Sequence, residues 1–213
     1  DFTGDYTRLI RLFEGSALED SFYYYKLGTT FNLDLIHSGI KHDPHNVDYL
    51  DYMYAAYAAC FKKDERTIEI FKNTLQRNLD GNSELSTSTI SLDLVTKSDW
   101  TKRQEPGIMS VINFFKEFSR QELSFFETSS TASRSVIEQL LTSERTIIID
   151  LSSPSSLEKK TFLMFVMLAK IIHYVQNDRE FMPKFITLPH LDLIFDAFFI
   201  DKNMGYGRIN KFF

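Results

Sequence analysis

Apolar residues recur along much of the chain with the periods of helices and strands. In residues 5–14 the apolar positions form one stripe at helical spacing, which predicts a short helix. Residues 46–61 and 64–79 carry apolar side chains at three- and four-residue steps. Residues 107–126 follow the helical pattern as well. These segments predict a substantial helical section in the first two thirds of the chain.

Several residues mark the ends of these helices. Lys62 and Lys63 close the last turn of the helix at 46–61, where positive charge is favourable. Asp64 is the predicted N-cap of the next helix, so the two form an antiparallel pair with a tight joint. Further along, Ser155 to Glu158 form a capping box, which opens a long helix running to about Gln176.

Short apolar runs predict the strands. The aromatic run at 21–27 favours a strand over a helix. Residues 145–151 read RTIIIDL, a β-branched run typical of a strand covered on both faces in a parallel sheet. KFITL at 184–188 is a second buried strand. Strand, crossover helix and strand form a βαβ unit, so we expect 145–151 and 184–188 to lie parallel in one sheet.

The predicted fold class is therefore α/β, with a parallel or mostly parallel sheet. We expect residues 1–213 to form one domain with a helical insertion at about 46–126. Within this section, the Ser- and Thr-rich stretch from Asp80 to Trp100 contains one candidate edge strand, at 89–95. Because the chain opens at Asp1 without Met, as if a strand had just ended, we also expect it to be the central fragment of a longer polypeptide.

Composition narrows the class of protein. The chain has 20 Phe and 10 Tyr, which at this density favour an aromatic core. A net charge of -5 argues against a dedicated nucleic-acid-binding domain. Cys60 is the only cysteine and is expected to be a buried, inert thiol in a reducing compartment. Since no apolar run is long enough to span a bilayer, we expect a cytoplasmic protein without membrane insertion.

Candidate chemistry gathers at the ends of the predicted strands, because open α/β sheets bind ligands beyond their carboxyl ends. Asp150 ends the first late strand and is the candidate catalytic carboxylate, able to accept a magnesium-bound water. The alternative is that Asp150 bonds N–H groups of the turn that follows. His190, after Pro189, is a candidate for a phosphate contact, with the satisfaction of loop carbonyls as its alternative.

Other candidate groups are weaker. His37, His42, Asp43 and His45 form a loose cluster without cysteine, so we predict no metal site, although a zinc hydrolase stays an alternative. Gly205 to Arg208 either places an arginine near a phosphate or forms a solvated connection. The phosphate-binding pattern G-x-x-x-x-G-K-[ST] is absent, so ATP and Mg²⁺ are expected only with a loop upstream of the chain.

Taken in order, these segments resemble the HerA/FtsK superfamily of DNA-pumping P-loop ATPases, particularly the branch similar to type IV secretion and conjugative DNA-transfer ATPases. The segment that looks most like that family is TIIIDLSSPSSLEKKTFLMFVMLAKIIHYV, similar to its strand and long following helix. The other quoted matches are DFTGDYTRL, FNLDLIHSG with Leu33 in place of the family's proline, NVDYLDYMYAAY, ERTIEIFKNTLQRNL, and KFITLPHLD at the Walker B strand.

The resemblance implies a P-loop NTPase type of sheet, ATP and Mg²⁺ as ligands, and a ring of homo- or hetero-oligomeric subunits, hexameric in that family, that moves DNA. It places Asp1, Asp5 and Asp150, together with His190, at the nucleotide edge. The family's Asp-Glu pair is replaced by Pro189-His190, which neither supports magnesium nor orients water. The loss of such charge stabilisation costs about 3 kcal/mol or more in a barrier.

We therefore predict a catalytically impaired ATPase-like domain that acts in DNA transfer or as an assembly or regulatory module. The alternative is a non-enzymatic α/β protein-interaction domain without nucleotide binding.

Overall fold

The computed structural model describes residues 1, 3–30, 33, 47–80, 106–120 and 142–177. This part of the chain is mixed helix and strand, with a small parallel sheet compatible with the predicted α/β class. Its elements, in chain order, are α1 (Tyr6–Phe13), a 3₁₀ turn (Glu19–Ser21), β1 (Phe22–Lys26), α2 (Val47–Phe61), α3 (Glu65–Asp80), α6 (Pro106–Arg120), β2 (Thr146–Asp150) and α8 (Leu157–Asn177).

The described sheet consists of β1 and β2, which pair in parallel with Phe22 opposite Thr146 and Lys26 opposite Asp150. On the other edge of β2, the Asp1 nitrogen donates to the Ile149 carbonyl oxygen at 2.8 Å. The Leu151 N–H donates to the Asp1 carbonyl oxygen at 2.7 Å. The carboxyl end of β2 is therefore held from both sides.

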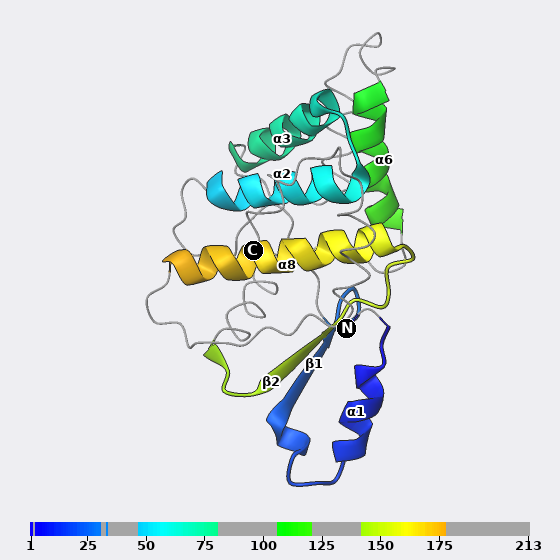
Figure 1. The fold of residues 1–213 in the computed structure, drawn as a ribbon, viewed down its shortest axis with the longest axis vertical. Helices are drawn as coiled ribbons and strands as arrows, with labels where there is room; N and C mark the ends of the chain where they lie inside the picture. The colour runs from blue at the N-terminus through cyan, green and yellow to red at the C-terminus, as the bar shows by residue number, and fades with distance from the viewer. Residues whose placement is uncertain (2, 31–32, 34–46, 81–105, 121–141, 178–213) are drawn as a thin grey trace.

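Alternate residues of the two strands face opposite layers. Tyr25, Ile147 and Ile149 pack against the helical core. Tyr24 faces the opposite way and contacts Thr7 of α1. The sheet thus lies between α1 on one face and α8 on the other, with α2 beyond α8 (Figure 1).

The helical pair agrees with the sequence prediction. The Asp64 carboxylate accepts the Thr67 N–H at 2.8 Å and the Thr67 hydroxyl at 3.0 Å, which confirms Asp64 as the N-cap of α3. These hydrogen bonds lower the pKa of Asp64. The expectation for Lys62 and Lys63 was wrong, because both follow α2 instead of lying in its last turn. Lys62 has a φ of 46°, the left-handed conformation that commonly ends a helix.

The long helix α8 begins at Leu157, one residue later than the predicted capping box implies. The hydroxyl of Ser156, not that of Ser155, accepts the Lys159 N–H at 3.3 Å. Lys159 therefore occupies the third helical position, which the predicted box assigned to Glu158. Its ammonium group reaches Glu117 Oε1 of α6 at 2.7 Å, so this lysine links two helices.

An aromatic cluster holds the helices together. The Phe114 ring lies within 5.5 Å of the rings of Tyr57 and Phe61 on α2, Phe71 on α3 and Phe162 on α8, measured between ring centroids. All four of these contacts are edge-to-face, one of the geometries that aromatic pairs prefer. For the described residues, the prediction that the aromatic side chains build the core is confirmed.

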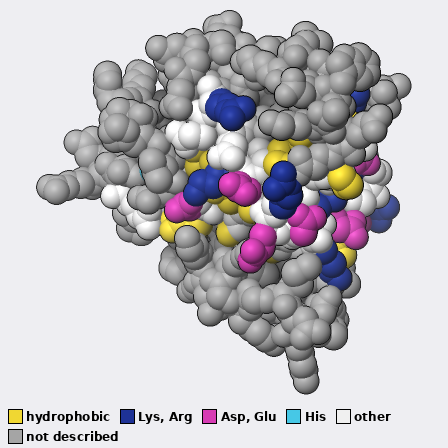
Figure 2. All heavy atoms as spheres, turned by 90° about the horizontal axis from the view of Figure 1, so that it is seen from above, with side chains coloured by type: hydrophobic (Ala, Val, Ile, Leu, Met, Phe, Trp, Pro, Cys, Tyr) yellow, Lys and Arg dark blue, Asp and Glu magenta, His cyan; other side chains and the backbone are white. Residues whose placement is uncertain are grey.

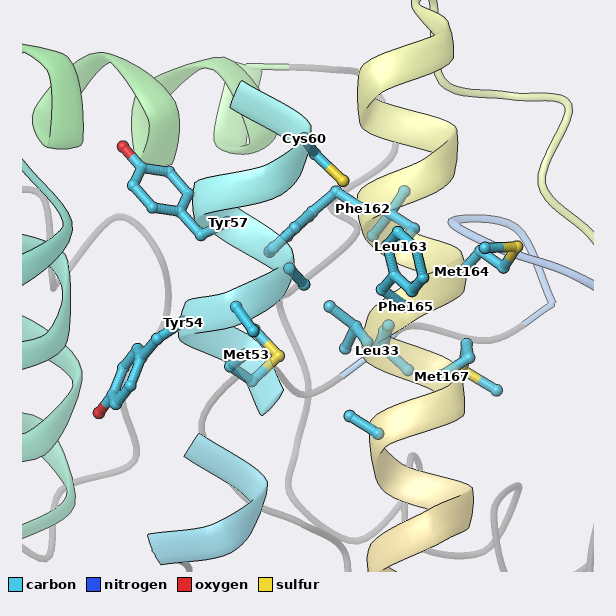
Figure 3. Close-up of a cluster of buried hydrophobic side chains, with 14 of the residues drawn as sticks. Leu33, Met53, Tyr54, Tyr57, Cys60, Phe162, Leu163, Met164, Phe165 and Met167 are labelled. Atoms are coloured by element: carbon cyan, nitrogen blue, oxygen red, sulfur yellow. The ribbon is translucent and has the colours of Figure 1, made fainter. Parts of the chain in front are cut away.

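The largest interface between described helices joins α2 and α8 (Figure 3). Met53 and Cys60 of α2 face Phe162, Leu163 and other apolar side chains of α8 there. Cys60 is buried as predicted, and burial raises the pKa of its thiol. None of the helices in the described ranges combines the length and the apolar character that crossing a membrane requires.

Several predicted elements lie outside the described residues. They are the strand at 184–188 that was expected beside 145–151, the edge strand at 89–95, and the end of the helix predicted at 107–126. The pairing of 145–151 with 184–188 therefore stays a prediction. Among the described strands, β2 pairs in parallel with β1, which lies more than a hundred residues earlier in the chain.

Phe114→Ala is expected to lower the free energy of unfolding by about 3–5 kcal/mol, because it removes the ring that all four helices share. Urea denaturation followed by far-UV circular dichroism measures this loss. Met109→Ala on the same helix is the matched control, since Met109 is 41% exposed. Its effect should stay within about 0.5 kcal/mol. Equal effects of the two substitutions would contradict the role given to the cluster.

Candidate functional site

Asp150 lies at the carboxyl end of β2 with its side chain 1% exposed. Its Oδ1 accepts the Ser152 N–H at 2.7 Å, and its Oδ2 accepts the Tyr24 hydroxyl. The Lys26 Nζ lies 4.0 Å from the same Oδ2. The bond from the Ser152 N–H agrees with the alternative interpretation of Asp150, in which its carboxylate accepts N–H groups of the turn that follows the strand. The catalytic role of Asp150 stays a prediction.

Two opposing effects set the charge state of Asp150. Burial alone would raise the pKa of its carboxyl group. The hydrogen bonds from Ser152 and Tyr24, together with the Lys26 ammonium, outweigh burial and hold this pKa below its ordinary value. Burial and the neighbouring carboxylate raise the pKa of Tyr24. At neutral pH the pair is therefore an ionised acceptor with a neutral phenol donor.

The other two described candidates, Asp1 and Asp5, lie in the turn that leads into α1. The Asp1 carboxylate accepts the N–H groups of Gly4 at 2.9 Å and Tyr6 at 3.1 Å. The Thr3 hydroxyl donates to Asp5 Oδ2 at 2.6 Å and also lies 3.2 Å from Asp1 Oδ1. Asp1 thus closes the turn and supplies the start of the helix with an acceptor. Asp5 occupies the N-cap position without a capping bond of its own.

Gly4 brings this turn against the end of β2. A Cβ atom added there would lie 3.4 Å from Ser152 Oγ and 4.0 Å from Asp150 Oδ2. The φ of Gly4 is +80°, which other residues adopt only with strain. The structure therefore brings Asp1 and Asp150 to neighbouring positions at one sheet edge, with Asp5 linked to Asp1 through Thr3. His190 lies outside the described residues.

Sequence reasoning missed the partners of Asp150. Tyr24 and Lys26 are two residues apart in β1, so alternation places them on one face. The register with β2 then sets that face beside Asp150. Thr7 completes the set, because its hydroxyl donates to the Tyr24 oxygen at 2.9 Å. The alternation was readable in FYYYK, but nothing local identified the strand that pairs with it.

The carboxylate of Asp150 is a buried acceptor in a hydrogen-bond network. Each of its oxygens accepts one hydrogen bond, from Ser152 or from Tyr24, and the residue is 1% exposed, so burial limits the access of a metal-bound water or a cation. In the described ranges, no three or more His, Cys, Asp or Glu side chains gather closely enough to bind a metal ion. The predicted histidine cluster at 37–45 and the arginine segment at 205–208 lie outside those ranges.

Comparison with known proteins gives no match to any protein-family model, any curated protein or any solved structure. The resemblance to DNA-pumping ATPases therefore stays a hypothesis.

Asp150→Asn is expected to lower the free energy of unfolding by about 2 kcal/mol at neutral pH, because two hydrogen bonds lose their ionised acceptor. The ordinary pKa of an aspartate is 3.8, and that of folded Asp150 is lower. Its contribution is therefore complete above that ordinary value and is lost as the pH falls through the folded pKa. Urea denaturation between pH 2.5 and 7 should show the wild-type and variant curves converging at the acid end.

Asp5→Asn provides the matched control for this experiment, because Asp5 is exposed and its carboxylate accepts a hydrogen bond from the neighbouring Thr3 hydroxyl. We expect a change of about 0.5 kcal/mol or less. A pH-independent difference between wild type and Asp150→Asn would show that the carboxylate charge contributes nothing.

Proposed function

We propose that this chain is the central part of a catalytically impaired P-loop-NTPase-like domain related to DNA-translocating ATPases. It serves DNA transfer or assembly rather than hydrolysis. The observation that carries the proposal is the position of Asp150, at the carboxyl end of a parallel strand and between Lys26 and Asp1. Open α/β sheets bind their ligands at this edge.

The bonds of Asp150 support the impaired character of the domain. A carboxylate that activates water needs an open position for that water. Asp150 is instead 1% exposed, and its oxygens accept hydrogen bonds from Tyr24 and Ser152, which hold the end of β2 to its neighbours. The Pro189-His190 pair in the sequence points the same way, because neither residue replaces an acidic pair.

DNA contact is proposed to come through an assembly of homo- or hetero-oligomeric subunits in the cytoplasm. On the face drawn in Figure 2, the described basic and acidic side chains are interspersed, and the chain carries a net charge of -5. A protein that binds DNA by itself usually gathers its basic residues on one surface. ATP and Mg²⁺ are proposed ligands only in combination with a phosphate-binding loop upstream of Asp1.

A second candidate function is a non-enzymatic protein-interaction domain of α/β type. The observation that favours it is the surface of α1 and the turn after it. Leu12 is 78% exposed and Leu18 is 51% exposed, while Leu9 lies at 37%. Leu9 and Leu12 are three residues apart and so lie on one face of α1, and exposed apolar side chains on one face commonly mark contacts with other proteins.

A thermal-shift experiment on the full-length protein with ATP and Mg²⁺ separates the two functions. Nucleotide binding at a hundredfold the dissociation constant is expected to add about 2.7 kcal/mol to stability. The interaction-domain alternative predicts no shift. Mg²⁺ without ATP serves as the control, because a shift with the cation alone would not report on nucleotide.

ATP turnover tests the second part of the proposal, with and without DNA. We expect none above background. Turnover that Asp150→Ala abolishes would contradict the proposal, because it would show that catalysis survives and depends on this carboxylate.

A further inference from the structure

Among the described α-helices, only α1 has no buried side chain. It is eight residues long, whereas an isolated helix needs about 12–15 residues even to be marginally stable in water. The helix therefore depends on its attachments to the rest of the protein. At its far end the Phe13 ring stacks on Phe22, with centroids 5.1 Å apart. At its start, Asp1 closes the preceding turn.

The attachment near the first turn of α1 is a chain of hydroxyl groups that ends on a charge. The Thr7 hydroxyl of α1 donates to the Tyr24 oxygen of β1 at 2.9 Å. The Tyr24 hydroxyl donates in turn to Asp150 Oδ2 of β2. Because the final acceptor is an ionised carboxylate, it polarises the Tyr24 hydroxyl and strengthens the bond from Thr7. The Asp150 carboxylate of β2 thus binds β1 directly and α1 through the Tyr24 hydroxyl.

We propose that α1 is a strap fastened to the sheet by the Asp150 carboxylate, acting through the Tyr24 hydroxyl. Removal of that carboxylate, or of the hydroxyl between, releases the helix while the α2–α8 core stays folded. Release opens the sheet face that carries Tyr24 and Asp150, while Asp1 keeps the Gly4 turn attached to β2. The strap is independent of nucleotide binding, so it stands or falls separately from the proposed function.

Hydrogen exchange of the backbone amides in full-length protein tests the strap directly. In Tyr24→Phe, the amides of Leu9 to Phe13 are expected to exchange at least about tenfold faster than in wild type, since a charge-assisted hydrogen bond is lost. The amides of α2 and α8 should keep their wild-type rates. Tyr23→Phe is the matched control. Tyr23 lies on the other face of β1, where its ring stacks under Arg145, and α1 exchange should not change.

Thr7→Val tests the hydrogen bond at the α1 end of the hydroxyl series. Valine keeps the branched shape of threonine and has nearly the same helix propensity, so only the hydroxyl is lost. Faster exchange of α1 in this variant supports the strap. Unchanged α1 exchange in both Thr7→Val and Tyr24→Phe would overturn it, and so would an equal acceleration in α8, which reports general destabilisation.

A double variant tests the carboxylate as the fastening point. Asp150→Asn should release α1, and Asp150→Asn combined with Tyr24→Phe should release it no more than Tyr24→Phe alone. Effects that add in full would show that Asp150 acts on the helix by another route and would overturn the proposal. If Asp150→Asn does not fold, Tyr24→Phe and Thr7→Val decide the question by the criteria above.

Discussion

The packing of aromatic rings around Phe114 is the constraint on which the rest of the described structure depends. Phe114 lies on α6, and three further helices, α2, α3 and α8, each contribute at least one ring to its surroundings. Their convergence fixes the position of α8, and Ile147 and Ile149 of the sheet pack against the apolar core to which these helices contribute. The apolar core therefore positions the polar edge of the sheet, although none of its side chains takes part in the candidate site.

The two faces of the sheet are held by different forces. The face toward α8 is apolar and buries side chains from both strands, so its stabilisation is mainly hydrophobic. The face toward α1 relies on hydroxyl groups and one carboxylate, and it covers no fully buried side chain of that helix. Such polar attachments are directional and depend on a charge state, whereas apolar burial does not. This contrast explains why the candidate chemistry and the weakest helix lie on the same side.

Much of the local structure could be predicted from the sequence. The helices at 6–13, 47–61, 65–80 and 157–177 follow apolar periodicity and capping residues that are visible within a few turns of chain. Local signals also led to errors of one residue, as at Ser156, where two adjacent serines offer the same cap. Lys62 was misplaced because a charge pattern does not reveal a left-handed backbone. The pairing of β1 with β2 joins segments far apart in the chain, and periodicity contains no information about such a partner.

The candidate site also has a part that the sequence predicts and a part that depends on long-range pairing. Asp150 stood out because it ends a β-branched run, but its bonds to Tyr24 and Ser152 depend on register and on the path of the turn.

The single cysteine shows how such packing protects a reactive group. Cys60 lies on α2 and is buried at the interface with α8. Burial raises the pKa of its thiol and so keeps the sulfur protonated. Oxidants attack the thiolate, so a folded molecule is spared the oxidation that threatens an exposed cysteine. Only copies in which these helices have separated become vulnerable to sulfenic acid or to cross-linking with one another. Oxidation of Cys60 would therefore fall on the molecules that have already lost their structure.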